Sequence, residues 1–98
     1  MTFFITGAGR GIGLELTQFA LEAKHRVFAL VRDPHSARTL AQAKKEYGDQ
    51  LIILQGDVTS RKDLFAAKDA LGAESIDILI NNAGVLTDSD EGLYFYKY

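Results

Sequence analysis

Cysteine is absent from this chain of 98 residues. Without cysteine the chain can form neither a disulfide framework nor a thiolate metal site. The two histidines, His25 and His35, stand apart from other ligand types, so we expect no metal site. This composition fits a reducing, cytoplasmic setting.

An excess of charge of one sign is also missing, since the formal net charge is -2. Nothing therefore draws the molecule to phosphate backbones or anionic lipid, and we expect neither nucleic-acid nor membrane partners. Long hydrophobic runs are missing too. The apolar start, Phe3-Phe4-Ile5, breaks at Gly7, which leaves it too short for a signal-peptide core or a membrane span. We expect the mature chain to begin at Met1.

The chain does hold an alternation of short apolar runs with stretches of helical period. Nearly half of its residues, 47%, are hydrophobic, which is enough for one small domain. This alternation is typical of βαβ units, in which helices cover a parallel sheet. We predict an α/β domain with three helices and four strands, the strands at residues 2–6, 27–32, 51–55 and 76–81.

The first predicted helix follows the glycines near the start of the chain. Its apolar residues recur at spacings of three and four and form one stripe. We expect this stripe to face the sheet; its members are Ile12, Leu16, Phe19, Ala20 and Ala23.

Capping residues delimit the other two predicted helices. Asp33, followed by proline, is typical of a helix N-cap and first turn, and Gly48 ends that helix. Ser60 with Asp63 resembles a capping box, although aspartate replaces the usual glutamate or glutamine. We expect this third helix to end at Gly72.

Glycine recurs where the first strand turns into the first helix, in the run Thr-Gly-Ala-Gly-Arg-Gly-Ile-Gly at residues 6–13. A dinucleotide pyrophosphate needs backbone amides at a helix N-terminus with no side chain in the way, and Gly7, Gly11 and Gly13 offer this. A tight turn without a ligand is the alternative. Four glycines in seven residues destabilise a small domain unless something uses them.

The spacing T-G-x-x-x-G-x-G resembles the glycine motif of the short-chain dehydrogenase/reductase family. The resemblance implies a partial Rossmann fold, with three layers in the order βαβαβαβ and a parallel sheet ordered 3-2-1-4. It also implies that the loop binds a nicotinamide dinucleotide through Gly7, Gly9, Arg10, Gly11, Ile12 and Gly13.

Two arginines bear on which dinucleotide binds. Arg10 places a cation near the positive end of the first helix, which costs about 0.3 to 1 kcal/mol unless an anion binds there. A solvated arginine is the alternative. In the family, a basic residue here and another at the end of the second strand, where Arg32 stands, imply preference for the 2′-phosphate of NADP. An NAD binder would carry an acid, and Asp33 fits a helix cap better, so we expect NADP(H), with NAD(H) as the alternative.

Two further motifs that match the family follow the third and fourth predicted strands. They lie at the carboxyl edge of the sheet, where open α/β sheets bind ligands. By the resemblance, Asp57 and Val58 contact the adenine, and the run Asn-Asn-Ala-Gly at residues 81–84 lines the adenine ribose through Asn81, Ala83 and Gly84. For Asp57 the alternative is a turn aspartate that bonds its own backbone. For the second match the alternative is a simple strand-ending turn.

The resemblance covers about residues 2–92, the first two fifths of a typical family member. Members of the family catalyse with a serine and a Tyr-x-x-x-Lys pair, in which the lysine lowers the pKa of the tyrosine. Neither element has a place here. The closest look-alike of the pair is Tyr94 with Lys97, but Tyr94 stands three residues before Lys97 instead of four. We therefore expect no catalytic residue. We divide the chain into a truncated dinucleotide-binding domain, residues 1–92, and an aromatic tail, residues 93–98, which could form an extra strand or an oligomer contact.

The early end predicts an open fourth-strand edge, because residues 85–92 are too few for a helical crossover to a parallel fifth strand. We expect a homodimer or higher oligomer through that edge or the tail; a disordered tail is the alternative. As function we expect NADP(H) binding without hydride transfer by the chain alone. Two alternatives stay open. One is an NADPH-dependent carbonyl oxidoreductase completed by a separate C-terminal half or an oligomer, and the other is a degenerate interaction module that binds no nucleotide.

Overall fold

A computed structural model describes residues 1–82 and 94–97 of the chain. The strands form one sheet in the order β3-β2-β1-β4-β5, in which β1 to β4 run parallel. This confirms the predicted α/β fold and its 3-2-1-4 strand order. Along the chain the elements are β1 (Thr2–Thr6), α1 (Gly11–Glu22), β2 (Arg26–Val31), η1 (Pro34–Ser36), α2 (Arg38–Tyr47), η2 (Gly48–Gln50), β3 (Leu51–Gln55), α3 (Arg61–Leu71), β4 (Ile78–Asn81) and β5 (Tyr94–Lys97).

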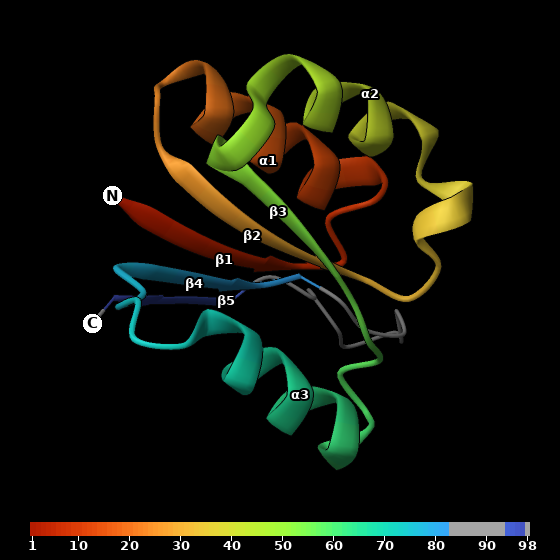
Figure 1. Ribbon diagram of the computed structural model, residues 1–98, viewed down its shortest axis with the longest axis vertical. Helices are drawn as coiled ribbons and strands as arrows, with labels where there is room; N and C mark the ends of the chain where they lie inside the picture. The colour runs from red at the N-terminus through yellow and green to blue at the C-terminus, as the bar shows by residue number, and fades with distance from the viewer. Residues whose placement is uncertain (83–93, 98) are drawn as a thin grey trace.

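Helices cover both faces of the sheet, α1 and α2 on one face and α3 on the other (Figure 1). The core under α1 and α2 includes Ile5 of β1 and Leu40 of α2, both fully buried. The smaller core under α3 includes Phe4, Phe28 and Ala67. Because neighbouring residues of a strand enter opposite cores, the strands read as continuous apolar runs instead of alternating patterns.

The apolar stripe predicted for α1 is wrong at three positions, since Ala23 is also exposed and lies just past the end of the helix, as its C-cap. Ile12 is 57% exposed and Phe19 is 72% exposed. The inner face of α1 holds the polar residue Thr17 instead. Its buried hydroxyl is satisfied because it donates to the carbonyl oxygen of Gly13 over 2.8 Å. The residues that α1 buries are Gly13, Thr17, Ala20 and Leu21.

The second predicted helix starts in two pieces. The side chain of Asp33 accepts a hydrogen bond from the backbone N–H of His35 over 3.0 Å and caps the short 3₁₀ turn η1, and α2 begins only after that turn. The predicted ends of α2 and α3 are confirmed. Gly48 and Gly72 have φ angles of +58° and +60°, in the left-handed region that favours glycine at helix ends.

The outer edge of β4 is paired within the chain. β5 runs antiparallel to β4, with Lys97 opposite Ile78 and Tyr94 opposite Asn81. An antiparallel neighbour needs no helical crossover, which removes the obstacle that applied to a parallel strand. The expectation of an open fourth-strand edge is therefore wrong.

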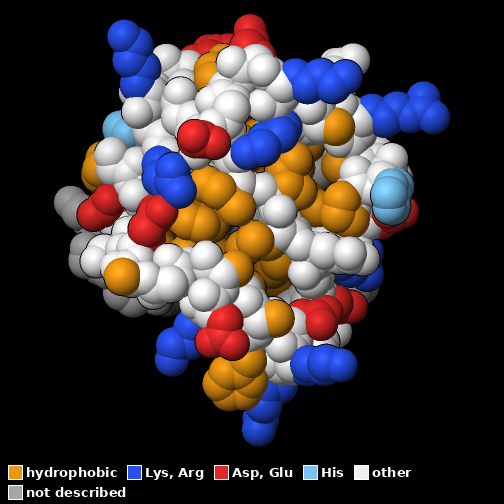
Figure 2. All heavy atoms as spheres, in the orientation of Figure 1, with side chains coloured by type: hydrophobic (Ala, Val, Ile, Leu, Met, Phe, Trp, Pro, Cys, Tyr) orange, Lys and Arg blue, Asp and Glu red, His pale blue; other side chains and the backbone are white. Residues whose placement is uncertain are grey.

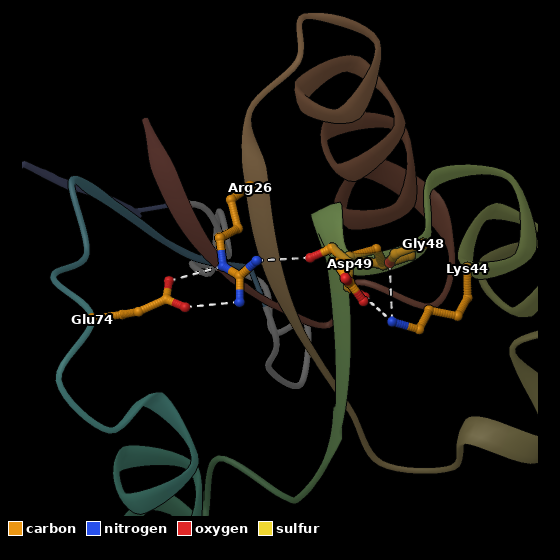
Figure 3. Close-up of polar contacts among 6 residues, drawn as sticks. Arg26, Lys44, Gly48, Asp49 and Glu74 are labelled. Carbon is orange, nitrogen blue, oxygen red and sulfur yellow. Dashed lines mark hydrogen bonds and ion pairs between the residues drawn. The ribbon is translucent and has the colours of Figure 1, made fainter.

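Polar contacts tie the amino ends of the strands together (Figure 3). The Arg26 guanidinium lies 2.9 Å and 2.7 Å from the two carboxylate oxygens of Glu74, and it donates to the carbonyl oxygen of Asp49 over 2.8 Å. The ammonium of Lys44 donates to the carbonyl oxygen of Leu51 over 2.6 Å. A charged group thus covers the start of β3, the other edge strand of the sheet.

Apolar side chains reach the surface between the two helix layers, and charged side chains surround them (Figure 2). Among the residues that the structure describes, no helix has the length and apolar character that crossing a bilayer requires.

Candidate functional site

The loop between β1 and α1 turns at glycines that have left-handed backbones. Gly7 has a φ of +62° and Gly11 a φ of +57°, angles that other residues rarely adopt. Arg10 is the N-cap of α1, and its side chain makes no capping hydrogen bond. The first N–H groups of a helix lack intrahelical acceptors, so this end of α1 suits an anion.

Gly13 packs against the protein itself. A Cβ at this position would lie 2.1 Å from the carbonyl oxygen of Gly7 and 2.6 Å from Nδ2 of Asn82. The two atoms also contact each other, because the Asn82 amide donates to that same Gly7 oxygen over 3.3 Å, so a side chain here would disturb this hydrogen bond. Gly13 is thus required by the contact between the loop and the end of β4, a reason that the motif alone did not reveal.

Thr6, at the end of β1, joins the loop to the end of β4. Its buried hydroxyl donates to Oδ1 of Asn81 over 3.0 Å and accepts from the backbone N–H of Asn82 over 2.9 Å. Sequence reasoning missed this role, although Thr6 opens the glycine motif. Asn81 thus contacts the residue that opens the loop, whereas the predicted site residues Ala83 and Gly84 lie outside the described residues.

Two other loop residues of the predicted site differ in their surroundings. A Cβ on Gly9 would lie 3.2 Å from Cβ of Ala37 and 3.3 Å from Cγ1 of Val31, so Gly9 allows the loop to pack on the end of β2 and the segment before α2. Ile12 is exposed in the first turn of α1. The structure therefore gives Gly9 a packing role and leaves Ile12 open to solvent.

A cavity of about 370 Å³ opens at the carboxyl ends of β2 and β3. The prediction named two of its lining residues, Arg32 and Asp57. Sequence reasoning missed the other three, Gln55, Gly56 and Asp63. Arg32 supplies the positive charge of the lining, and the two carboxylates supply the negative charge.

The Asp57 carboxylate is oriented by its own turn. Its Oδ1 accepts from the backbone N–H of Thr59 over 2.9 Å and from the Thr59 hydroxyl over 2.8 Å. These bonds lower the pKa of Asp57, and the nearby Arg32 lowers it further. Asp57 thus forms the turn named as the alternative and also lines the cavity as an anion. Its neighbour Val58 is half-buried against the core under α3.

Asp63, in the first turn of α3, fixes the same segment. Its backbone N–H donates to the hydroxyl oxygen of Ser60 over 3.2 Å, which confirms the predicted cap. Its carboxylate does not complete a capping box, because it accepts from the backbone N–H of Asp57 over 2.8 Å. The aspartate that stands in place of glutamate in the capping box therefore holds the Asp57 backbone and lines the cavity.

Two exposed arginines follow the carboxyl ends of β1 and β2. Arg10 is exposed at the N-cap of α1, and Arg32 is exposed beside the cavity. The nearest acid in the sequence, Asp33, is engaged with the N–H of His35 in its own turn. This arrangement suits an anionic group near the two arginines.

A sequence profile of the family described as short chain dehydrogenase matches residues 1–94. The chain belongs to the short-chain dehydrogenase family. Among curated members, 3beta-hydroxysteroid dehydrogenase 2 of Eggerthella lenta is 34% identical over 87 residues. The NADP-dependent 3-hydroxy acid dehydrogenase YdfG of Escherichia coli (strain K12) is 38% identical over 87 residues. Each match covers 87% of this chain and 34% of the relative.

Solved structures of short-chain dehydrogenases share the fold. A carbonyl reductase from Pseudomonas aeruginosa PAO1, solved in complex with NADP, superposes with a TM-score of 0.82 at 34% identity. That match covers 86% of this chain and 38% of the reductase. Serine dehydrogenase from Escherichia coli superposes with a TM-score of 0.76 at 37% identity over 89% of this chain and 39% of its own. The chain thus spans about a third of the length of its curated relatives.

The tyrosine and lysine that look most like the family's catalytic pair lie in strand β5. Tyr94 and Lys97 are the first and last residues of that strand. The absence of catalytic residues stays an expectation from the sequence.

Proposed function

We propose that this chain binds a nicotinamide dinucleotide at the carboxyl edge of its sheet. The observation that carries the proposal is that the glycine loop and the cavity beside Asp57 follow neighbouring parallel strands and so open at one edge. The relatives support it, since one is named for NADP dependence and another was solved in complex with NADP.

In this proposal the predicted residues other than Ile12 each have a part in binding. The N-terminus of α1, opened by Gly7 and Gly11, holds the pyrophosphate. Gly9 allows the loop to pack on the end of β2, and Gly13 allows α1 to pack on the loop and the end of β4. The adenosine lies between the cavity and the end of β4, in reach of Asp57, Val58 and Asn81. By the family resemblance, Ala83 and Gly84 also contribute to its ribose contacts.

We assign the preference for NADP(H) over NAD(H) to Arg10 and Arg32. A guanidinium pairs with a phosphate through parallel charge-assisted hydrogen bonds, which a ribose hydroxyl cannot match. Asp33, the acid that would favour NAD(H), accepts a backbone hydrogen bond in its own turn.

Calorimetry on the full chain with NADPH and NADH tests the proposal. We expect NADPH to bind at least about tenfold more tightly, which corresponds to about 1.4 kcal/mol. Arg32→Ala should remove most of this difference by weakening NADPH binding. Lys45→Ala, which removes an exposed cation of α2, is the matched control and should change neither affinity. Absence of binding at millimolar nucleotide would refute the site, and tighter NADH binding would refute the preference.

We further propose that the chain alone transfers no hydride, because the family's serine and Tyr-x-x-x-Lys pair have no match in it. The test follows NADPH absorbance with a panel of aldehydes and ketones. Oxidation that depends on carbonyl substrate would overturn this part and favour the carbonyl oxidoreductase alternative.

We also propose a homodimer through the outer edge of β5, since β5 occupies the edge of β4. An edge strand presents unpaired backbone groups to a second chain. A monomeric mass by light scattering at micromolar concentration would rule out this dimer.

A further inference from the structure

The outer face of α3 exposes an aromatic side chain among cations. Phe65 is 60% exposed and lies two residues from Ala67, the residue that α3 buries. At about 100° per residue, Phe65 is on the side of the helix turned away from the sheet. Among the elements that the structure describes, α3 is the one helix on its side of the sheet (Figure 1). This apolar surface is therefore not part of the core.

Three cations surround Phe65 on the exposed face of α3. Arg61 and Lys68 lie one helical turn before and after it, and Lys62 lies beside it. One acid, Asp69, shares this face, so the patch has an excess of positive charge on a chain whose net charge is -2. Figure 2 shows an apolar side chain projecting at the α3 end of the molecule, with Lys or Arg side chains around it. We call residues 61, 62, 64, 65 and 68 the α3 patch.

The cations of the α3 patch have no ion-pair partner among the described residues, in contrast to Arg26 with Glu74. Arg61 and Lys62 also occupy the first turn of α3, where the helix dipole disfavours positive charge. An anionic group from outside would relieve both the mutual repulsion and the unfavourable dipole term.

An apolar groove runs beside the patch and enlarges its apolar part. It has a volume of about 280 Å³ and lies between α3 and the strands β1 and β4. Leu64, which is 44% exposed, and Lys68 belong both to the groove and to the patch. The apolar lining of the groove consists of Phe4, Val58, Leu64, Ala67, Leu71, Ile76 and Leu79.

We propose that the α3 patch and its groove bind an acidic, amphipathic segment of another polypeptide. Its apolar side chains would pack on Phe65 and Leu64 and enter the groove, while its carboxylates would pair with Arg61, Lys62 and Lys68. This interaction is separate from the proposed nucleotide site.

Charge favours an acidic polypeptide over two other partners, a second copy of this chain and an anionic bilayer. Two copies of the chain that met patch to patch would bring their cations together, which is repulsive. A flat anionic bilayer would contact more of the surface than the patch, on a chain with net negative charge. A single acidic helix is narrow enough to contact the patch and the groove alone.

The test is a titration of the isotope-labelled full chain, followed by amide NMR shifts, with a synthetic peptide. The peptide is 15 to 20 residues of Glu, Ala and Leu, with Leu at spacings of three and four, and a second peptide carries Gln for every Glu. We expect shifts over residues 61–71 and a dissociation constant of roughly 10 to 500 μM for the acidic peptide, since a patch one helix long is smaller than the ~800 Å² per partner of stable interfaces. The Gln peptide should bind at least about fivefold more weakly.

Variants assign the binding to the patch. Phe65→Ser should raise the dissociation constant at least about tenfold, and Arg61→Gln with Lys62→Gln roughly threefold to tenfold. Phe19→Ser, which removes the exposed phenylalanine of α1, and Lys45→Gln are matched controls and should leave it unchanged. Equal binding of both peptides, shifts centred elsewhere, or an equal effect of Phe19→Ser would overturn the proposal. Binding to phosphatidylserine vesicles that depends on Phe65, without peptide binding, would replace the polypeptide by a membrane.

Discussion

The side-chain amide of Asn82 donates to the carbonyl oxygen of Gly7 over 3.3 Å, although the two residues lie 75 positions apart. Gly13 fills the space beside this hydrogen bond, since a Cβ there would lie within 3 Å of both partners. The glycine motif and the asparagine pair are thus one packed unit. A change in either motif should disturb the other.

The first prediction concerns this close approach. Gly13→Ala should lower the free energy of unfolding by about 3 kcal/mol, at the upper end of the usual cost of overpacking, because the new Cβ meets backbone. It should also abolish nucleotide binding. Urea unfolding and calorimetry measure the two effects.

Gly72→Ala is the control for Gly13→Ala. A Cβ at Gly72 meets nothing within 4 Å, but its φ of +60° strains any other residue, which costs about 1 to 2 kcal/mol. Nucleotide affinity should stay unchanged. A stability loss in Gly13→Ala no larger than in Gly72→Ala would contradict the close packing.

The second prediction concerns the Thr6 hydroxyl. Thr6→Val should cost about 1 to 3 kcal/mol of stability, because the Asn82 N–H and the Asn81 side chain lose a buried partner. Thr6→Ser keeps the hydroxyl and should cost less than Thr6→Val. Chemical denaturation of both variants measures this, and equal losses would show that the hydroxyl bonds contribute little.

The third prediction concerns the charge of Asp57. Two hydrogen bonds from Thr59 lower the pKa of Asp57, and the backbone bond lowers it more than the hydroxyl bond does. Thr59→Val removes only the hydroxyl bond. The pKa of Asp57 should therefore rise part of the way to its ordinary value. A lowered pKa means that the hydroxyl stabilises the fold while Asp57 is ionised, and that this contribution disappears as pH falls through the folded-state pKa.

An NMR pH titration of the Asp57 carboxyl carbon measures this shift, and Thr59→Ser, which keeps the hydroxyl, is the control. The stability difference between wild type and Thr59→Val should be larger at neutral pH than in acid. A titration curve unchanged by Thr59→Val would contradict the role of the hydroxyl.

The fourth prediction concerns Arg26 and Glu74, whose side chains are 39% and 36% exposed. A double-mutant cycle should give a coupling energy of about 0.5 to 1 kcal/mol that falls with added salt, as for other partly exposed pairs. Arg26→Ala should cost more than Glu74→Ala, because Arg26 also bonds Asp49 and lies 5.5 Å from the centre of the Phe28 ring. Equal costs of the two single variants would show that those further contacts are weak.

Much of the fold could be predicted because its cues are local. Strand β3 was predicted within its observed bounds from a run of apolar residues, and Gly48 and Gly72 end their helices as predicted. The start of α2 was missed because Asp33 caps a 3₁₀ turn, and an N-cap residue has the same appearance before either kind of helix.

The inner face of α1 could not be predicted from hydrophobicity. Ile12 and Phe19 fit a helical stripe, yet the helix turns Gly13 and Thr17 inward. Gly13 has to reach Gly7 and Asn82, and this requirement rotates the helix about its axis at the expense of two apolar side chains. No pattern within the helix reports a contact with residues so far along the chain.

The sequence by itself determined the alternation of strands and helices and the positions of the loop glycines, because local periodicity and short motifs carry that information. The strand order followed from the resemblance of those motifs to the family. Only the tertiary structure decided which atoms these motifs contact. It brought Thr6 between Asn81 and Asn82, aimed Asp63 at Asp57, and paired β5 with the edge of β4. The contacts of Thr6 and the pairing of β5 with β4 join residues far apart in the chain, and their geometry exists only once the sheet has aligned its strands. The contact of Asp63 with Asp57 is local, but it depends on how the loop before α3 folds.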